Sequence, residues 1–315
     1  YGGISNCNRV IYQLDNLDFE VTGKESVIAE LEVARAYWYY ILCEAFGNVP
    51  IVDRFDVPEG FLPETSSREE VFAFIENSIK NNVDKLSDDT KTYYGRFNKW
   101  NAKMLLARLY LNAESWIGKN MYTECMALCT EIMNSNKYAL ENDYSAPFYA
   151  QNEGSQEIIF AYPADEVKTG STIYMALQKT LHPSNVKTFN LQTWLDNGVC
   201  AVPTFIDTYE EGDKRLPKTW RMGQQYGSDG SILYCTGLVP GWEGKPLIYT
   251  KEVSNLENGG EAEGYRCGKY EIKMGTSRAL DNDWVAMRYA EVYLMKAECI
   301  LRTNGNAEEA AQLVN

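Results

Sequence analysis

The stretch ARAYWYYILCEAFGNVPIV, residues 34–52, holds four consecutive aromatic side chains and only two charged ones, Arg35 and Glu44. Such a segment could cross a membrane, bind a ligand or fill a core. Pro50 has no N–H to donate and moves the preceding residue away from helical angles, which predicts a helix end near Phe46. The apolar helical part, residues 34–46, is then about 20 Å long, against about 30 Å for a bilayer core. We therefore predict a helix that does not span a membrane.

The helix that contains this stretch is predicted to start at Val27, with Ser26 as its cap. Its second half is apolar nearly all round. One stripe consists of Ala36, Tyr39, Tyr40, Cys43 and Phe46, and a second of Trp38, Leu42 and Ala45. A helix without a polar face is buried between neighbours. We therefore expect a core element that takes no part in ligand binding.

Further helical patterns follow in pairs. They cover residues 65–86, with Ser66 or Ser67 as the cap, and residues 98–113, 122–138, 284–305 and 306–315. In the fourth of these, Ala290, Leu294, Ala297 and Leu301 are expected to share one face. Tetratricopeptide repeats need a small residue where two helices cross closely. Ala107 with Tyr110, Ala297 with Ile300, and the later Cys125 and Ala310 match that pattern in part, which indicates helical repeats without proving them.

The character of the chain changes between about residues 144 and 283. Fifteen of the 23 glycines lie from Gly154 to Gly275, and the helical period fades. Short strands are predicted at residues 155–163 and 246–253, and a short helix at 203–212 with Pro203 at its start. A loop region of this length inside a helical protein is usually functional.

The composition excludes several partners. The net charge is −14 and the pI about 4.7, and no cluster of Lys and Arg is present, so nucleic acid and an anionic membrane surface are not expected as partners. The eight cysteines are scattered without a C-x-x-C pair, which argues against a zinc site, and Cys125 and Cys129 are expected as buried packing residues. Both ends of the chain are expected to be cut from a longer protein, so a lipid anchor would lie outside this sequence.

Catalytic and metal motifs are not found. His182 is the one histidine, and neither a nucleophile elbow nor a zinc or phosphate-loop motif is present. A glycoside hydrolase needs paired carboxylates, and two acidic groups could supply them. One group is Glu210, Glu211 and Asp213, and the other is Asp281 with Asp283. Solvated helix ends explain both groups better. The second group also lacks the glycine and the glutamate of a calcium loop. We predict no catalytic residue, no metal and no cofactor.

The aromatic residues of the loop region are the remaining signal. A pyranose ring stacks its C–H face on Trp or Tyr, and its hydroxyl groups need polar partners. The segments NLQTWLDNG (190–198) and TWRMGQQYGSDG (219–230) combine both residue types. Packing of the loops is the alternative for any single aromatic side chain. The predicted ligand-binding residues are Trp194, Trp220, Tyr226 and Trp242, with Asn190, Gln192 and Asn197 as polar contacts.

Six segments in order resemble motifs of the SusD/RagB family of nutrient-binding outer-membrane lipoproteins. They are residues 34–52, SSREEVFAFI (66–75), NAKMLLARLYLNA (101–113), SQEIIFAYP (155–163), FIDTYEEGDKRLP (205–217) and MRYAEVYLMKAECILR (287–302). The departures are small: Glu44 stands where a basic or polar residue is common, and Asn48 replaces an Asp. The resemblance covers nearly the whole chain, whereas each motif alone is weak.

The resemblance implies an all-α fold of tetratricopeptide-like helix pairs, a SusD-like superhelix, with a long loop-rich insertion that has a minor β content. We predict a single SusD-like domain over residues 1–315, with the scaffold at 26–138 and 284–315 and the presumed ligand-binding insertion at 139–283. The resemblance also implies a surface-exposed outer-membrane lipoprotein without catalytic activity. It would bind an oligosaccharide or another nutrient and deliver it to a SusC-like TonB-dependent transporter. An all-α glycoside hydrolase and a tetratricopeptide-type scaffold for protein partners are the alternatives.

Overall fold

The computed structural model describes residues 1–169, 179–277, 280–303 and 305–314. The chain divides into two compact units. The first contains Tyr1–Leu140, Gln156–Ala161 and Ala286–Asn315, and the second Glu141–Ser155 and Tyr162–Val285. The predicted organisation as a single domain stays a prediction.

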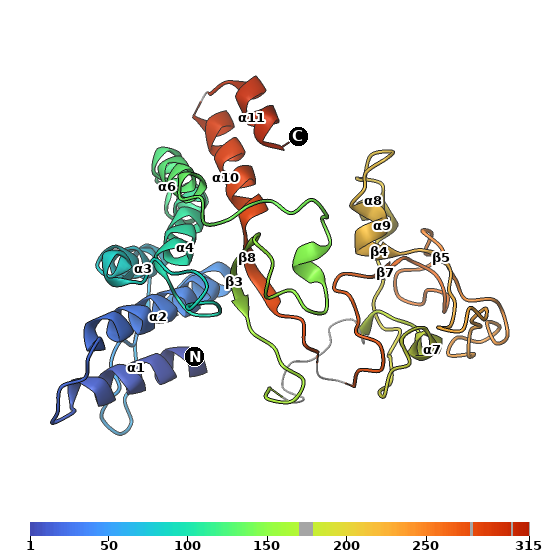
Figure 1. Cartoon of the computed structure of the whole chain (residues 1–315), viewed down its shortest axis with the longest axis horizontal. Coiled ribbons are helices and arrows are strands. Elements are labelled where there is room, and N and C mark those ends of the chain that lie inside the picture. The colour runs from blue at the N-terminus through green and yellow to red at the C-terminus, as the bar shows by residue number, and fades with distance from the viewer. Residues whose placement is uncertain (170–178, 278–279, 304, 315) are drawn as a thin grey trace. The chain divides into compact units, whose positions relative to one another are not determined.

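The first unit is helical. Its helices are α1 (Gly2–Asp15), α2 (Lys24–Phe46), α3 (Arg68–Lys80), α4 (Lys99–Leu111), α5 (Ala113–Ile117), α6 (Tyr122–Asn134), α10 (Tyr289–Arg302) and α11 (Ala307–Val314). Contacts run in series, from α1 to α2 and α3, then through α4 and α6 to α10 and α11 (Figure 1). A series of antiparallel helix pairs in which each helix packs on the next is the tetratricopeptide-like arrangement that the sequence predicts. The all-α fold class with minor β structure is confirmed.

Helix α2 ends as predicted but starts earlier. Gly47 follows Phe46 with a φ of 74°, a conformation that favours glycine, and Pro50 lies beyond it. The start is Lys24 rather than Val27, because Gly23 takes up the left-handed conformation before it, and Ser26 lies inside the first turn without capping. The predicted cap is therefore wrong.

Helix α2 is not expected to span a membrane, but the reason is its polarity and not its length. With 23 residues, α2 is about 35 Å long and could cross a bilayer core. Its first half is polar, however, with Glu25, Glu30 and Glu32. None of the helices in the described part of the chain is both long and apolar enough to cross a membrane.

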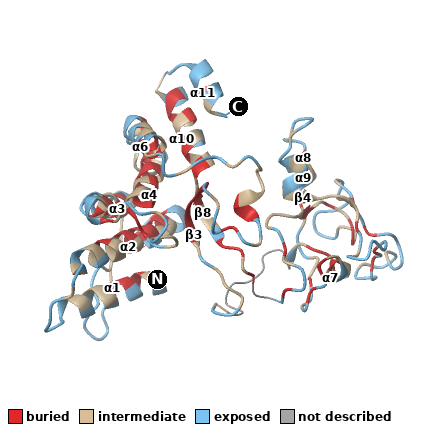
Figure 2. Cartoon of the chain, in the orientation of Figure 1, coloured by how far each residue is buried: buried red, intermediate tan, exposed pale blue. Residues whose placement is uncertain are grey.

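The aromatic run of α2 is buried on one face. Tyr39 is 1% exposed, and its hydroxyl group accepts from the Val52 N–H at 2.7 Å and donates to the Val52 carbonyl oxygen at 3.1 Å. Its ring lies edge-on to Phe74. Trp38 and Phe46, in contrast, are 36% and 72% exposed, so the expected burial all round the helix is wrong. Figure 2 shows buried, intermediate and exposed residues along α2.

The start of α3 shows how the sequence sets a helix end. The Ser67 hydroxyl group accepts from the Glu70 N–H, and the Glu70 carboxylate accepts from the Ser67 N–H at 2.7 Å. This reciprocal capping box satisfies two N–H groups that would otherwise have no partner. Asn98 and Asn101 form the same arrangement before α4. Both caps lie where the sequence predicts helix starts.

The small residues of the repeat pattern lie at helix crossings. Ala107, Cys125 and Cys129 are fully buried, as predicted for packing residues. Ala297, Ile300 and Ala310 form one hydrophobic cluster between α10 and α11. Small side chains at these positions let the helix axes approach closely.

The helix predicted from residue 284 starts later. Trp284–Arg288 form strand β8, which pairs with β3 (Ile158–Tyr162), and α10 begins only at Tyr289. The four residues predicted to share one face all lie in α10, but that face is not the buried one, because Leu294 and Leu301 are exposed. The buried side is instead formed by Val292, Met295 and Cys299, at spacings of three and four residues. A second two-stranded sheet joins β1 (Val49–Pro50) to β2 (Thr65–Ser66).

The second unit consists of loops with short elements. These are α7 (Val186–Phe189), α8 (Pro203–Ile206), α9 (Leu216–Thr219), β4 (Trp220–Arg221), β5 (Gly223–Gln224), β6 (Ile248–Tyr249) and β7 (Arg266–Cys267), with 3₁₀ turns at Ala146–Phe148 and Pro183–Asn185. Strand β3 is present as predicted, whereas the predicted strand at 246–253 is only β6. The helix predicted at 203–212 is only the single turn α8.

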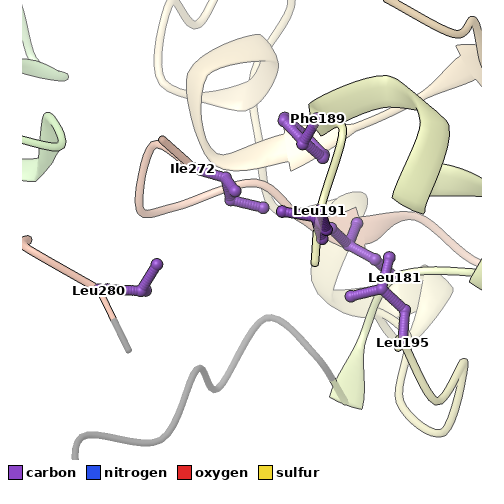
Figure 3. Close-up of a cluster of buried hydrophobic side chains, with 6 residues drawn as sticks. All are labelled: Leu181, Phe189, Leu191, Leu195, Ile272 and Leu280. Atoms are coloured by element: carbon purple, nitrogen blue, oxygen red, sulfur yellow. The ribbon is translucent and has the colours of Figure 1, made fainter. Parts of the chain in front are cut away.

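Two small hydrophobic clusters support these loops. One contains Leu181, Phe189, Leu191, Leu195, Ile272 and Leu280 (Figure 3). The other contains Leu233, Cys235, Leu247, Tyr249 and Ala262, with Trp242 packed against it. Because the loops carry little regular structure, these clusters fix the positions of the short strands that border the pocket described below.

Candidate functional site

A pocket of about 610 Å³ opens in the second unit. Its wall contains the aromatic residues Phe148, Tyr149, Trp220 and Tyr226, the amides Gln224 and Gln225, and the charged residues Lys218, Arg221, Lys269 and Glu271. A pocket of this volume can hold a ligand of a few sugar rings. Aromatic surface next to polar groups is the composition that sugar binding requires.

Two short antiparallel ladders hold this wall. Trp220 pairs with Cys267 and Arg221 with Arg266 between β4 and β7, and β5 pairs with β6. The indole N–H of Trp220 donates to the Tyr209 hydroxyl group at 3.2 Å, and Phe205 lies edge-on to the indole ring. The ring of Trp220 is therefore fixed before any ligand arrives.

The side-chain amides of Gln224 and Gln225 are hydrogen-bonded to the backbone. Gln225 is buried and donates to the carbonyl oxygens of Met222 and Gly223. Gln224 donates to the carbonyl oxygens of Gln225 and Leu247. Since their N–H groups are engaged with the backbone, the donors left for a ligand are mainly the charged side chains of the wall.

Two of the predicted binding residues, Trp220 and Tyr226, come together in this pocket. Trp194 is exposed at 58% and is not part of the wall. Trp242 packs on a hydrophobic cluster beneath Lys245, whose ammonium lies 4.8 Å from the indole ring centre. A role in binding for these two tryptophans stays a prediction.

The three predicted polar contacts also lie outside the pocket wall. Asn197 donates to the Glu261 carbonyl oxygen and accepts from Arg266 at 2.9 Å, which gives it a structural task. The Asn190 side chain accepts from the Ser228 hydroxyl group, and Gln192 donates to the Asn190 carbonyl oxygen. Their role in binding likewise stays a prediction.

Sequence reasoning did not select several wall residues. Phe148, Tyr149, Lys269 and Glu271 come from segments more than one hundred residues apart, and nothing in their local sequence joins them. Arg221 could have been predicted as a wall residue, because it follows Trp220 directly in the sequence. The signal is a charged residue next to an aromatic residue that is predicted to stack on a sugar.

Three of the acidic residues that could serve catalysis, Asp213, Asp281 and Asp283, form contacts that support loops. Asp213 pairs with Arg215 at 2.6 Å, and this side-chain hydrogen bond lowers the pKa of Asp213. Asp281 pairs with Lys273 at 2.6 Å, which lowers the pKa of Asp281. Asp283 is buried and accepts from the Ala164 N–H at 2.8 Å. A catalytic acid needs a raised pKa, so the first two pairs are unsuited to that task.

His182 is buried in a hydrogen-bond network. Its Nε2 atom lies 2.6 Å from a carboxylate oxygen of Glu261, and its Nδ1 atom accepts from the Ser184 N–H at 3.0 Å. Nδ1 is therefore unprotonated, and Nε2 donates to Glu261. The backbone N–H groups that donate to Glu261 belong to Thr236, Gly237 and Val239, at 2.5–3.3 Å. Glu261 thus holds the loop at residues 236–239 in place.

This network does not fit a metal ion, although His182, Cys235 and Glu261 offer ligand atoms within 4.8 Å of one another. A metal ligand needs a free lone pair. The lone pairs of Glu261 are used by N–H donors, and the unprotonated nitrogen of His182 faces the Ser184 N–H. Burial raises the pKa of the Cys235 thiol, which disfavours the thiolate that a metal would need.

The network predicts a loss of stability in mild acid. Burial lowers the pKa of His182 below its ordinary 6.5, although Glu261 acts in the opposite direction. Burial alone would raise the pKa of Glu261, but the hydrogen bonds from His182 and the loop outweigh it and lower that pKa below 4.5. In both cases the unfolded chain binds the proton first as pH falls. We expect the free energy of unfolding to decrease below about pH 6.5, by at most about 1.4 kcal/mol per pH unit for His182.

Urea denaturation at pH 7.5, 6.5, 5.8 and 5.0 measures this dependence. His182 is the one histidine of the chain, so the window from pH 6.5 to 5.8 reports on it, whereas carboxylates contribute closer to pH 5. In a His182→Asn variant the slope between pH 6.5 and 5.8 should disappear. An unfolding free energy of the natural protein that stays constant across the window would contradict the prediction.

Comparison with known proteins identifies the chain. A family model described as "SusD family" matches residues 120–315, which is more than half of the chain. The chain belongs to the SusD family. A second family model, described as "Starch-binding associating with outer membrane", matches residues 1–111.

Two relatives show how far the likeness to this SusD family member extends. The "Starch-binding protein SusD" of Bacteroides thetaiotaomicron is 27% identical over 316 residues, covering 89% of this chain and 55% of that protein. A "SusD-like protein" of Bacteroides ovatus is 26% identical over 144 residues, covering 44% of this chain and 26% of its own length. The chain therefore spans little more than half the length of the first relative.

Solved structures share the fold. A SusD superfamily protein from Parabacteroides distasonis superimposes with a TM-score of 0.76 at 21% identity, over 100% of this chain and 64% of that one. Surface glycan-binding protein A from Bacteroides uniformis gives a TM-score of 0.71 at 20% identity, over 100% of this chain and 63% of that one. At these identities the likeness shows the fold alone.

Proposed function

We propose that this chain is the binding part of a protein that captures an oligosaccharide at the outer membrane surface. The observation that carries the proposal is the pocket with Trp220 and Tyr226 on its wall. The names of two relatives, one starch-binding and one glycan-binding, support the same ligand class.

Trp220 and Tyr226 are suited to stacking. Trp220 is half-buried and held by Tyr209, and Tyr226 is 50% exposed. The carbonyl oxygen of Tyr226 accepts from the Thr188 hydroxyl group at 2.8 Å, which anchors its backbone. Rigid rings offer a sugar face at a low entropic cost, because little side-chain freedom is lost on binding.

We propose binding without catalysis. Glycoside hydrolysis by the usual route needs two carboxyl groups on opposite sides of the bond. Among the described wall residues, Glu271 supplies one, and its carboxylate accepts from the Ala150 N–H at 2.8 Å. Incubation with the bound glycan and chromatography of the products should show no hydrolysis, and released oligosaccharides would favour the hydrolase alternative.

We also propose delivery to a SusC-like TonB-dependent transporter, over which the protein closes, and attachment to the outer membrane by a lipid anchor. The match of the first 111 residues to a family associated with the outer membrane supports this location. Affinity purification of the full-length protein from detergent-solubilised outer membranes tests it. Recovery of a TonB-dependent transporter is expected, and its repeated absence would count against this part.

Trp220→Ala and Tyr226→Ala test the pocket. We expect each to weaken glycan binding by at least about 1 kcal/mol, about fivefold in Kd, because a stacking surface is lost. A glycan array selects the ligand, and isothermal titration calorimetry measures the Kd values.

Tyr234→Ala is the matched control, since Tyr234 is an exposed aromatic residue outside the pocket wall. Its Kd should stay within twofold of the natural protein. If Trp194→Ala weakens binding and Trp220→Ala does not, the binding surface lies around Trp194 and the pocket is wrong.

A further inference from the structure

Arg221 is a cation of the pocket wall without a counterion. It forms no ion pair with the described residues, and its Nε atom is buried without a hydrogen-bond partner. No hydrogen bond to another described residue engages its two Nη atoms. Arg221 as a whole is half-buried. A charge that is partly removed from water is normally paired, because it loses hydration without compensation.

The local structure fixes this guanidinium group. Its central carbon lies 4.5 Å from the ring centre of Phe189, which is buried in the cluster of Figure 3. Gly268 leaves room for the side chain, since a Cβ atom there would lie 3.2 Å from the Arg221 Cγ atom. Packing of one face against an aromatic ring leaves the N–H groups at the edges of the guanidinium plane for a ligand.

The neighbouring charges do not neutralise Arg221. Arg266 stands opposite it in the β4–β7 ladder, and its guanidinium donates to backbone carbonyl oxygens and to Asn197. Two like charges directly opposite each other in a ladder are unfavourable. Burial is the main influence on the pKa of Arg221 and lowers it, which agrees with a guanidinium that lacks an anionic partner.

The other charged groups of the wall are engaged. Lys218 lies 3.4 Å from Asp143, and the Lys269 ammonium lies 3.8 Å from the ring centre of Phe148. Glu271 is held by the Ala150 N–H. With three cations and one carboxylate among its described wall residues, the pocket carries positive charge on a chain whose net charge is −14.

We propose that Arg221 binds an anionic group of the ligand, so that the pocket selects an oligosaccharide that carries a carboxylate or a sulfate ester. The inference rests on the proposed sugar-binding function of the same pocket. A guanidinium group can donate two parallel hydrogen bonds to either oxyanion, and an anion would supply the missing partner. The aromatic rings would then stack on the face of the sugar ring, and Arg221 would favour acidic over neutral oligosaccharides.

A glycan array with matched pairs tests the selection. It carries uronic-acid, sialic-acid and sulfated oligosaccharides, each beside its carboxyl-reduced or desulfated neutral form. We expect the natural protein to bind at least one acidic form at least tenfold more tightly than its neutral counterpart. The two kinds of pair show whether a carboxylate or a sulfate ester is preferred. Equal or tighter binding of the neutral forms throughout would overturn the inference.

Three variants assign the selection to Arg221. In Arg221→Gln the preference for the acidic form should fall to twofold or less, with binding of the neutral form unchanged within twofold. Lys214→Gln, which removes an exposed cation outside the pocket wall, is the matched control and should keep the preference. Trp220→Ala should weaken the acidic and the neutral form alike. A preference that survives in Arg221→Gln overturns the role of Arg221.

The two proposals fail differently. If Trp220→Ala weakens binding and the ligand is neutral, the sugar site stands and the role of Arg221 is wrong. If Trp220→Ala has no effect on any glycan, the pocket itself is wrong. Thermal unfolding of the natural protein gives a measurement without variants: the acidic form should raise the unfolding temperature more than its neutral counterpart at equal concentration, and the same shift from both overturns the inference.

Discussion

Glu261→Gln is expected to lower the free energy of unfolding by about 1–3 kcal/mol, the cost of leaving buried hydrogen-bond donors without their acceptor. Glu261 is fully buried, and its carboxylate accepts from His182 and from three backbone N–H groups. A glutamine has nearly the same shape, but its amide nitrogen would face N–H donors. The loop at residues 236–239 would then lose hydrogen bonds to the fully buried side chain of Glu261.

Urea denaturation at pH 7.5 measures this change, and Glu257→Gln is the matched control. Glu257 is exposed in the same loop region, so its substitution should alter stability by less than about 0.5 kcal/mol. A loss of less than about 1 kcal/mol in Glu261→Gln would mean that the network carries little of the stability of the second unit.

Tyr39→Ala is expected to cost about 3–5 kcal/mol, the range found when a buried aromatic side chain is truncated. Tyr39 is 1% exposed, packs edge-on against Phe74 and joins α2 to the backbone of Val52 through two hydrogen bonds. Tyr39→Phe removes only the hydroxyl group and leaves the Val52 N–H without its partner, so about 1–3 kcal/mol is expected.

Phe46→Ala is the control within the same helix. Phe46 is 72% exposed, and its truncation should change the unfolding free energy by less than about 0.5 kcal/mol. Circular dichroism at 222 nm in urea follows the helical unit in all three variants. Similar losses for Tyr39→Ala and Phe46→Ala would contradict the difference in burial between these two side chains.

The helical unit was largely predictable because its signals are local. Ser67 with Glu70 marks a helix start through contacts three residues apart, and Gly47 with Pro50 marks an end through backbone angles. Periodicity gave the helices but not every face: Leu294 and Leu301 are apolar yet exposed, since the neighbours of α10 cover the side of Val292 and Met295. Strand β8 was missed because its pairing with β3 joins residues more than one hundred positions apart.

The pocket was predictable only in part. Trp220 and Tyr226 lie six residues apart in one segment whose mixture of aromatic and polar residues signals a sugar site. Tyr149 and Glu271 join the same wall from distant segments. The sequence offers Trp194 as an equally good candidate, and nothing local distinguishes a tryptophan on a pocket wall from one outside it.

For this SusD family member the amino-acid sequence by itself determined the all-α fold class, the caps of α3 and α4, the end of α2, and the partly buried aromatic helix within residues 34–52. These features depend on backbone angles, side-chain period and capping contacts within a few residues. Only the tertiary structure decided that Arg221 lines the pocket without a counterion. The same holds for His182, which is buried and hydrogen-bonded to Glu261. Burial and charge pairing depend on residues brought together from distant parts of the chain, and no local pattern specifies them.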